Sequence, residues 1–127
     1  MSQRVLIVDD EESMRLFLAH TLTTGMQAEI TLAGTCEQAL RFTGSNVYDA
    51  ILLDLLMPGI GGFAVLYRLR ASTANAKTPV IIVSSDGAAA QRCLAAGANA
   101  YLVKPVQPRE LGATLRQHLA GRSHARN

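Results

Sequence analysis

The sequence has few of the residues that mark disulfide-rich, zinc-binding or aromatic-rich proteins. Its 127 residues include no tryptophan, only four prolines and only two cysteines, and aromatic residues make up 5% of the chain. Cys36 and Cys93 lie far apart, and no histidine cluster accompanies either of them. We therefore expect two reduced core thiols, and neither a disulfide nor a zinc site.

Long apolar segments and strong charge are also missing. No apolar run approaches the roughly 20 residues of a membrane span, and the run at 5–8 is too short for a signal peptide. We therefore expect a cytoplasmic protein without a membrane partner. The net charge is +2, and basic residues gather in the segment 121–127, which argues against direct binding of nucleic acid.

What the chain does contain is a regular alternation of strand-like and helix-like segments. Its length suits one domain, and 49% of its residues are hydrophobic, enough for a packed core. The short apolar runs, which are typical of buried strands, fall at 5–8, 28–33, 48–53, 80–83 and 101–103. The second run alternates more between polar and apolar residues, as a strand at a sheet edge would.

Five strand–helix units predict an α/β fold with an open parallel sheet, doubly wound, and helices on both faces. We expect one domain at 1–121, followed by a flexible tail or the start of a linker at 122–127. In the first helix, Phe17, Leu18 and Leu22 fall on the apolar face. Thr35 and Gln38 form the pattern of a capping box at the start of the second helix.

Reactive polar residues stand where four of the five expected strands end. They are Asp9 and Asp10, Asp54, Ser84 and Lys104, whereas the expected edge strand ends without one. Ligands of such sheets bind beyond the carboxyl ends of the strands, where the winding reverses. The sequence therefore predicts one site that gathers these side chains.

The residue types at these strand ends indicate phosphoryl chemistry. Crowded carboxylates repel each other and favour a hard divalent cation, and Mg²⁺ prefers oxygen ligands. A lysine offers a point charge for phosphate oxygens, and a serine hydroxyl offers a hydrogen bond. An aspartate such as Asp54 can act as the nucleophile that forms an aspartyl phosphate.

Five motif blocks appear in order at these strand ends: Asp9-Asp10, Asp54, Met57-Pro58-Gly59, Ser84 and Tyr101-Leu102-Val103-Lys104-Pro105. With these blocks the chain resembles the receiver domain of two-component response regulators, over about residues 4–119. The resemblance implies a flavodoxin-like, five-stranded parallel sheet in the order 2-1-3-4-5 with five helices.

The resemblance also implies a role for the acids. Asp54 would accept a phosphoryl group from a phosphohistidine on a sensor histidine kinase or a histidine phosphotransfer protein, as one step of a phosphorelay. Mg²⁺, with Mn²⁺ or Ca²⁺ as substitutes, would be held by Asp10 directly, by Asp9 through water, by Asp54 and by the backbone carbonyl of Leu56. The chain would be a signalling switch that catalyses only its own phosphorylation and dephosphorylation.

The same resemblance assigns the switch and its output. Lys104, over a cis bond to Pro105, and Ser84 would contact the phosphoryl group, and Tyr101 would turn inward as Ser84 moves. The change would reach the face of the fourth helix, fifth strand and fifth helix, and from there a downstream effector protein, an attached output domain or a weak homodimer.

Several positions depart from the family pattern. Leu56 is apolar where a polar side chain is common, and Asp86 is acidic. Both flank the line along which water would attack the phosphoryl group, and our hypothesis is that Leu56 slows hydrolysis. Asn99-Ala100 replaces an acidic pair, which puts the charged dimer interface of winged-helix regulators in doubt.

Other functions remain to be weighed against the switch. A phosphatase of the haloacid-dehalogenase type would need Asp-x-Asp-x-Thr after a strand, which neither acidic segment supplies. A flavin or nucleotide binder would need a glycine-rich loop after the first strand. A receiver-like interaction scaffold that is not phosphorylated stays as the alternative. The kinase, the output, the oligomeric state and the context, stand-alone or part of a longer chain, stay open.

Overall fold

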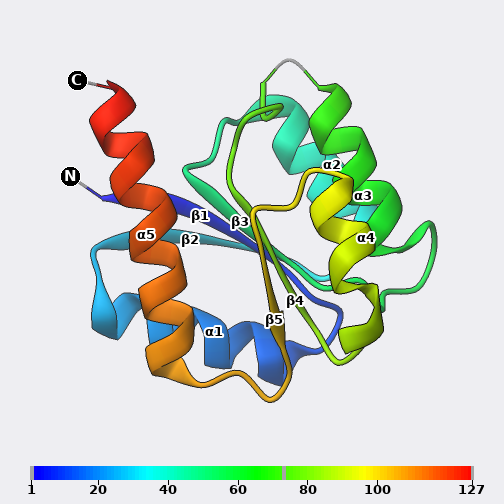
Figure 1. Ribbon diagram of the computed structural model, residues 1–127, viewed down its shortest axis with the longest axis horizontal. Helices are drawn as coiled ribbons and strands as arrows, with labels where there is room; N and C mark the ends of the chain where they lie inside the picture. Colours follow the sequence, from blue (N-terminus) through cyan, green and yellow to red (C-terminus); the bar gives the residue numbers. More distant parts are fainter. Residues whose placement is uncertain (1, 73, 127) are drawn as a thin grey trace.

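Five parallel strands form one twisted sheet in the computed structural model of the chain (Figure 1), which describes residues 2–72 and 74–126. The sheet order is β2-β1-β3-β4-β5, and every neighbouring pair is parallel. This order confirms the doubly wound fold and places the second strand at an edge, as its sequence pattern predicted. The strands are β1 (Gln3–Val8), β2 (Ala28–Ala33), β3 (Ala50–Leu53), β4 (Val80–Ser84) and β5 (Ala100–Val103).

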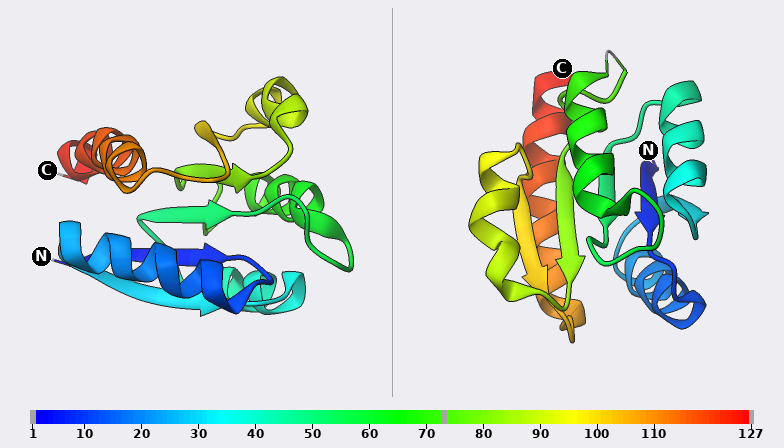
Figure 2. Two further views of the ribbon diagram at one scale, coloured as in Figure 1. Left: turned by 90° about the horizontal axis from the view of Figure 1, so that it is seen from below. Right: turned by 90° about the vertical axis from the view of Figure 1, so that its right-hand side faces the viewer.

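Helices cover both faces of the sheet (Figure 2). On one face, α1 and α5 pack with their leucines on the side chains of β1, β3 and β4 that point that way. On the other face, α2, α3 and α4 enclose a second apolar cluster. The helices are α1 (Glu12–Gly25), α2 (Cys36–Ser45), α3 (Gly61–Ala71), the short 3₁₀ helix η1 (Gly87–Ala89), α4 (Ala90–Ala95) and α5 (Pro108–Arg126).

The central strands are buried on both faces, which explains their continuous apolar sequences. Every residue of β3 and β4 is buried, so neither strand needs the polar alternation of a half-exposed one. The edge strand β2 instead exposes Glu29 and Leu32. No helix in the described part of the chain is both long and apolar enough to cross a membrane.

One expectation about α1 needs revision. Leu18 and Leu22 are buried in α1, but Phe17 is 40% exposed. The buried stripe of α1 follows the four-residue spacing of the two leucines, and Phe17 lies one position away from it, about 100° around the helix. The last helix, α5, runs to Arg126, and the boundary of the domain near residue 121 stays a prediction.

The capping and cysteine expectations can be compared directly with the structure. Thr35 Oγ1 accepts a hydrogen bond from the Gln38 backbone at 3.0 Å, as in a capping box. The Gln38 side chain reaches back one residue further than the motif requires, to the Gly34 amide at 2.8 Å. Cys36 and Cys93 are buried and free, which confirms their assignment as core thiols.

A buried polar network that was not predicted from the sequence lies at the amino end of the sheet. Asn75 is fully buried in the loop before β4. Its amide nitrogen donates to the carbonyl oxygens of Thr43 and Asn46 at 2.9 and 2.8 Å, and its oxygen accepts from the Tyr48 amide and the Thr78 hydroxyl, both at 3.0 Å. The network ties the loops before β3 and β4 to the end of α2.

Candidate functional site

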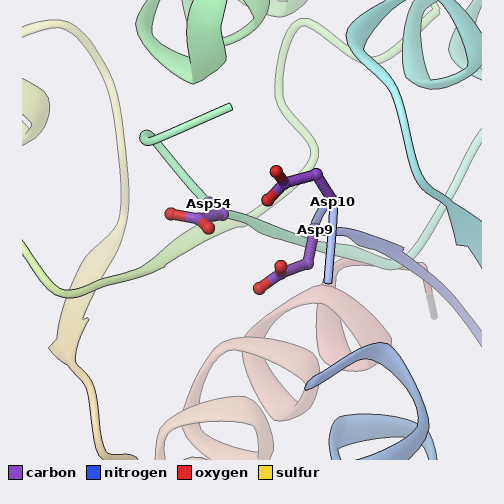
Figure 3. A group of neighbouring side chains, drawn as sticks. All are labelled: Asp9, Asp10 and Asp54. Carbon is purple, nitrogen blue, oxygen red and sulfur yellow. The ribbon is translucent and has the colours of Figure 1, made fainter. Parts of the chain in front are cut away.

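Three carboxylates meet where β1 and β3 end (Figure 3). Asp9 and Asp10 follow β1, and Asp54 follows β3, its neighbour in the sheet. Each acid offers an oxygen that lies within 4.8 Å of the others. Asp9 and Asp54 are only 1% and 4% exposed, whereas Asp10 is exposed. The predicted gathering of the three acids is therefore confirmed, with one of them open to solvent.

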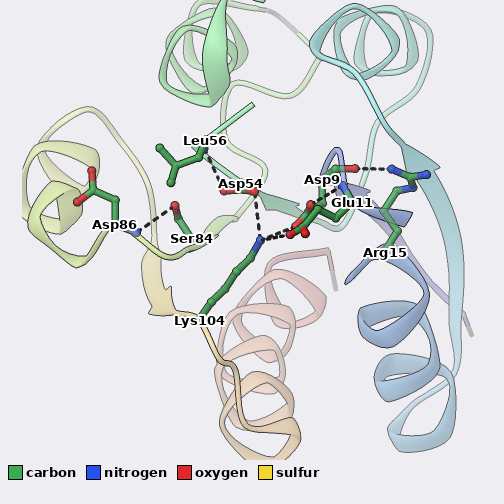
Figure 4. Close-up of polar contacts among 8 residues, drawn as sticks. All are labelled: Asp9, Glu11, Arg15, Asp54, Leu56, Ser84, Asp86 and Lys104. Carbon is green, nitrogen blue, oxygen red and sulfur yellow. Dashed lines mark hydrogen bonds and ion pairs between the residues drawn. The ribbon is translucent and has the colours of Figure 1, made fainter. Parts of the chain in front are cut away.

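Lys104, which follows β5, supplies the positive charge between these acids (Figure 4). Its Nζ lies 2.9 Å from Asp9 Oδ2 and 3.1 Å from Asp54 Oδ2, and its bond to Pro105 is cis. Burial lowers the pKa of the ammonium, but its hydrogen bonds to the two carboxylates and their negative charge outweigh the burial, so the pKa of Lys104 is raised overall. The lysine therefore stays charged at neutral pH.

Every polar group of Asp9 has a partner. The Asp9 amide donates to the carbonyl oxygen of Ala33 in β2 at 3.1 Å, and Oδ1 accepts from the Glu11 amide at 2.9 Å. Besides Lys104, a second basic side chain reaches this residue, because the Arg15 guanidinium donates to the Asp9 carbonyl oxygen at 2.7 Å. The carboxylate of Asp9 is thus fixed from both sides before any ligand arrives.

Asp54 is held by the backbone on either side of it. Its amide donates to the Val8 carbonyl oxygen at 3.0 Å, and its Oδ1 accepts from the Leu56 amide at 3.0 Å. The Leu56 side chain is 55% exposed beside the carboxylate. Behind the site, a Cβ on Gly62 at the start of α3 would collide with the Asp54 carbonyl oxygen, so only glycine lets α3 approach this closely.

Two hydroxyl groups lie beside the acids, from Ser84 in β4 and Tyr101 in β5. Ser84 is fully buried, and its Oγ accepts from the Asp86 amide at 3.4 Å. The Tyr101 hydroxyl donates to the Asp86 carbonyl oxygen and so closes over the same loop. Among the described contacts Ser84 makes no hydrogen bond to Asp54, so the structure places it near the acids without joining it to them (Figure 4).

Asp86 makes a further hydrogen bond, and the surroundings of Tyr101 shift its pKa. The Asp86 carboxylate accepts from the Ala88 amide at 3.1 Å and so caps η1, a local task that the sequence reasoning did not assign to it. Burial raises the pKa of the Tyr101 phenol, the hydrogen bond with Ser84 lowers it, and nearby acids raise it again, with a net upward shift.

The donor set suits a hard divalent cation. All three acids offer oxygen ligands, and two of them lie at the base of the site while Asp10 remains accessible to water. Mg²⁺ takes one or two carboxylates and keeps several waters in an octahedron. The residues present therefore fit such an ion, and the nearby lysine would neutralise charge on an incoming anion.

The comparison with protein families decides what kind of domain this is. The model of the response regulator receiver domain matches residues 5–116. The chain belongs to the response regulator receiver domain family. Among solved structures, the receiver domain of the sensor histidine kinase PA1611 from Pseudomonas aeruginosa, with a magnesium ion coordinated in its active-site cleft, has a TM-score of 0.86 at 29% identity and covers 94% of this chain and 99% of that one.

Other relatives place this receiver among signalling proteins. The chemotaxis response regulator CheY4 of Vibrio cholerae has a TM-score of 0.86 at 30% identity and covers 93% of this chain and 99% of its own. The transcriptional regulatory protein TcrA of Mycobacterium tuberculosis is 39% identical over 89% of this chain and 44% of its own length. The sensory/regulatory protein RpfC of Xanthomonas campestris is 37% identical over 90% of this chain and 16% of its own. The receiver thus spans less than half the length of these two curated relatives.

Two residues that shape the site were not predicted from the sequence. Arg15 lies in α1, six residues after Asp9, and nothing in the sequence distinguishes it from other arginines on helices. Gly62 opens α3, and no pattern in the sequence indicates that the Asp54 carbonyl lies against it.

Proposed function

We propose that this receiver is a phosphoacceptor switch that takes a phosphoryl group on Asp54 from a phosphohistidine. The observation that supports it best is the Lys104 ammonium, which lies between Asp54 and Asp9 next to the exposed Asp10. One charged lysine among three acids matches a site that receives an anion together with a cation. A scaffold without phosphorylation would have no need to gather these groups.

The metal would be held by the acids and one backbone group. Asp10, Asp9 and Asp54, together with the backbone carbonyl of Leu56, would hold Mg²⁺, and Mn²⁺ or Ca²⁺ would substitute. When bound, Mg²⁺ would neutralise charge on the transferring phosphoryl group.

In the transfer, the phosphorus–nitrogen bond of the donor phosphohistidine breaks and a phosphorus–oxygen bond to Asp54 forms. The donor imidazole leaves as the neutral group after it gains a proton. Lys104 already points at Asp54 from 3.1 Å and would move its ammonium onto the phosphoryl oxygens. Only small movements are needed, since the acceptor and the charge are in place beforehand.

The response would pass through Ser84 and Tyr101. Ser84 is buried next to the loop that Tyr101 covers, so a hydroxyl drawn toward the phosphoryl group would leave space for the aromatic ring. The face of α4, β5 and α5 carries the exposed apolar side chains of Leu94 and Val103. This face would meet a downstream effector, an attached output domain or a second copy in a weak homodimer. The switch would act in the cytoplasm, as one step of a phosphorelay.

The test is phosphorylation without a kinase. The protein is incubated with Mg²⁺ and a small phosphodonor such as acetyl phosphate, and its intact mass is measured. We expect one added phosphoryl group, lost in Asp54→Asn and on removal of Mg²⁺ by chelation. Glu29→Gln, an exposed acid on the edge strand, is the matched control and should be labelled normally. An unlabelled wild type at saturating donor would favour the scaffold alternative.

The lifetime of the phosphorylated form would depend on Leu56 and Asp86. The exposed Leu56 side chain stands beside the Asp54 carboxylate and would shield the phosphoryl group from attacking water. We expect Leu56→Asn to speed dephosphorylation several-fold, measured as loss of the labelled mass after the donor is removed. Leu94→Asn replaces another exposed leucine, on α4, and should leave the rate unchanged. An unchanged rate in Leu56→Asn would remove this role.

A further inference from the structure

Arg15 contacts the backbone between the two acids that follow β1. Its NH1 donates to the Asp9 carbonyl oxygen at 2.7 Å (Figure 4), a short distance that is typical of a hydrogen bond strengthened by charge. That carbonyl belongs to the peptide group whose nitrogen is Asp10. Because a peptide group is rigid and planar, a fixed carbonyl direction also fixes how the chain enters Asp10.

The other contacts of Asp9 fix this peptide only in part. Its amide donates to the Ala33 carbonyl oxygen and its Oδ2 accepts from Lys104, while the bond from the Glu11 amide to Oδ1 closes a turn that spans Asp10. Asp10 is exposed, so packing does little to orient it. Among the described contacts, the guanidinium of Arg15 is the side-chain group that bonds directly to the peptide between the two acids.

Gly34 provides the space that this guanidinium occupies. A Cβ on Gly34 would lie 2.9 Å from Arg15 NH1, closer than real Cβ contacts, and 3.3 Å from its Cζ, so the guanidinium would have to shift. Gly34 is not among the described glycines with positive φ, so its backbone conformation is open to any residue. The absence of a side chain at residue 34 thus serves the Arg15 guanidinium and not the turn.

We propose that Arg15, seated over Gly34, is a positioning residue that holds Asp9 and Asp10 in the geometry for binding a divalent cation. This inference rests on the proposed function, since it assumes that the acids bind Mg²⁺. It assigns Arg15 no contact with the metal or the phosphoryl group. Partners behind metal ligands commonly change metal affinity by about 10- to 100-fold when they are removed.

The sign of the effect separates positioning from simple electrostatics. Arg15 brings a positive charge toward a cation site, so its removal alone would tighten the binding of Mg²⁺. If the arginine orients the acids, its removal weakens binding in spite of the lost repulsion. Gly34→Ala gives an independent approach, because it keeps the charge and pushes the guanidinium away from the Asp9 carbonyl.

The experiment measures the Mg²⁺ dissociation constant by calorimetry, without phosphodonor, for wild type, Arg15→Gln, Gly34→Ala and the double variant. We expect each single variant to bind Mg²⁺ about tenfold more weakly, and the double variant to bind no more weakly than Arg15→Gln, because both changes break one contact. Arg41→Gln, an exposed arginine on α2, is the matched control and should bind like wild type.

Urea unfolding in the absence of metal accompanies each titration. Gly34→Ala should unfold at nearly the wild-type urea concentration, since the clash is with the flexible end of a side chain. If wild type binds Mg²⁺ and the variants bind it equally well or more tightly, the positioning role is overturned and the proposed function is left intact. A wild type that does not bind Mg²⁺ would overturn both.

Discussion

The ammonium of Lys104 bridges Asp9 and Asp54, at 2.9 Å from one carboxylate and 3.1 Å from the other. Both acids are almost fully buried, and they come from strand ends that are distant in sequence. A buried charge that loses its partner is strongly unfavourable, whereas the intact pair contributes less than its attraction suggests. The lysine thus holds together a site whose acids would otherwise repel.

The first prediction is that Lys104→Gln destabilises the metal-free protein. The two carboxylates would face each other without their counter-charge, and we expect a loss of about 2–3 kcal/mol in the free energy of unfolding. Urea unfolding in the presence of a chelator measures the loss, and saturating Mg²⁺ should restore part of it by binding the same acids. Lys77→Gln, at an exposed lysine, is the control. Equal stability of wild type and Lys104→Gln without metal would contradict the bridge.

Much of the fold and the site could be predicted because both depend on local patterns. Apolar runs indicated the strands, and Asp9, Asp10, Asp54 and Lys104 each follow such a run directly. In a parallel sheet the carboxyl ends of the strands meet at one edge, so order along the chain becomes proximity in space. The strand order itself came only from the family resemblance.

The features that could not be predicted depend on contacts between distant segments. The exposure of Phe17 depends on which stripe of α1 meets the sheet, and the helical pattern allowed several. Arg15 reaches back to Asp9 across the start of its own helix, and Asn75 binds loops on either side of β3. Neither contact has a sequence signature, since arginines on helices and asparagines in loops are common.

The second prediction concerns the close approach of α3 to Asp54. A Cβ on Gly62 would overlap the Asp54 carbonyl oxygen and the Leu55 Cα, which are backbone atoms that cannot move aside singly. We expect Gly62→Ala to lower the free energy of unfolding by more than about 2 kcal/mol, as overpacking does, and to slow phosphorylation of Asp54. Urea unfolding and the mass assay measure the two effects.

A second glycine serves as the control for this substitution. Gly44 lies in α2 with no atom within 4 Å of an added Cβ. Gly44→Ala should be neutral or stabilising by up to about 1 kcal/mol, because alanine favours helix more than glycine does. If Gly62→Ala were as stable as Gly44→Ala, the close packing of α3 on the β3 end would be wrong.

The third prediction separates stability from function through Asn75. Its side chain makes four hydrogen bonds inside the protein, and Asn75→Ala would leave buried backbone groups without partners. We expect a loss of about 2–4 kcal/mol in the free energy of unfolding. The network lies at the amino ends of β3 and β4, away from the acids, so the Mg²⁺ dissociation constant of the folded protein should not change. Gln91→Ala, at an exposed position on α4, is the control.

The last prediction uses the titration of Tyr101. Burial raises the pKa of its phenol above the ordinary value of about 10. The difference in tyrosinate absorbance between wild type and Tyr101→Phe isolates this phenol. We expect its component to appear at a pH above the ordinary value. A component at or below that value would mean that Tyr101 is not held over the β4–η1 loop in solution.

The same shift determines how stability depends on pH. A phenol whose pKa is higher in the folded state stabilises the protein fully below the unfolded pKa of about 10, and this contribution is lost as the pH rises through the folded-state pKa. Wild type should therefore lose more stability than Tyr101→Phe between neutral pH and the folded-state pKa of Tyr101. Urea unfolding of both proteins across this range measures the difference. A steeper loss in Tyr101→Phe would have the wrong sign for a phenol whose neutral form the fold favours.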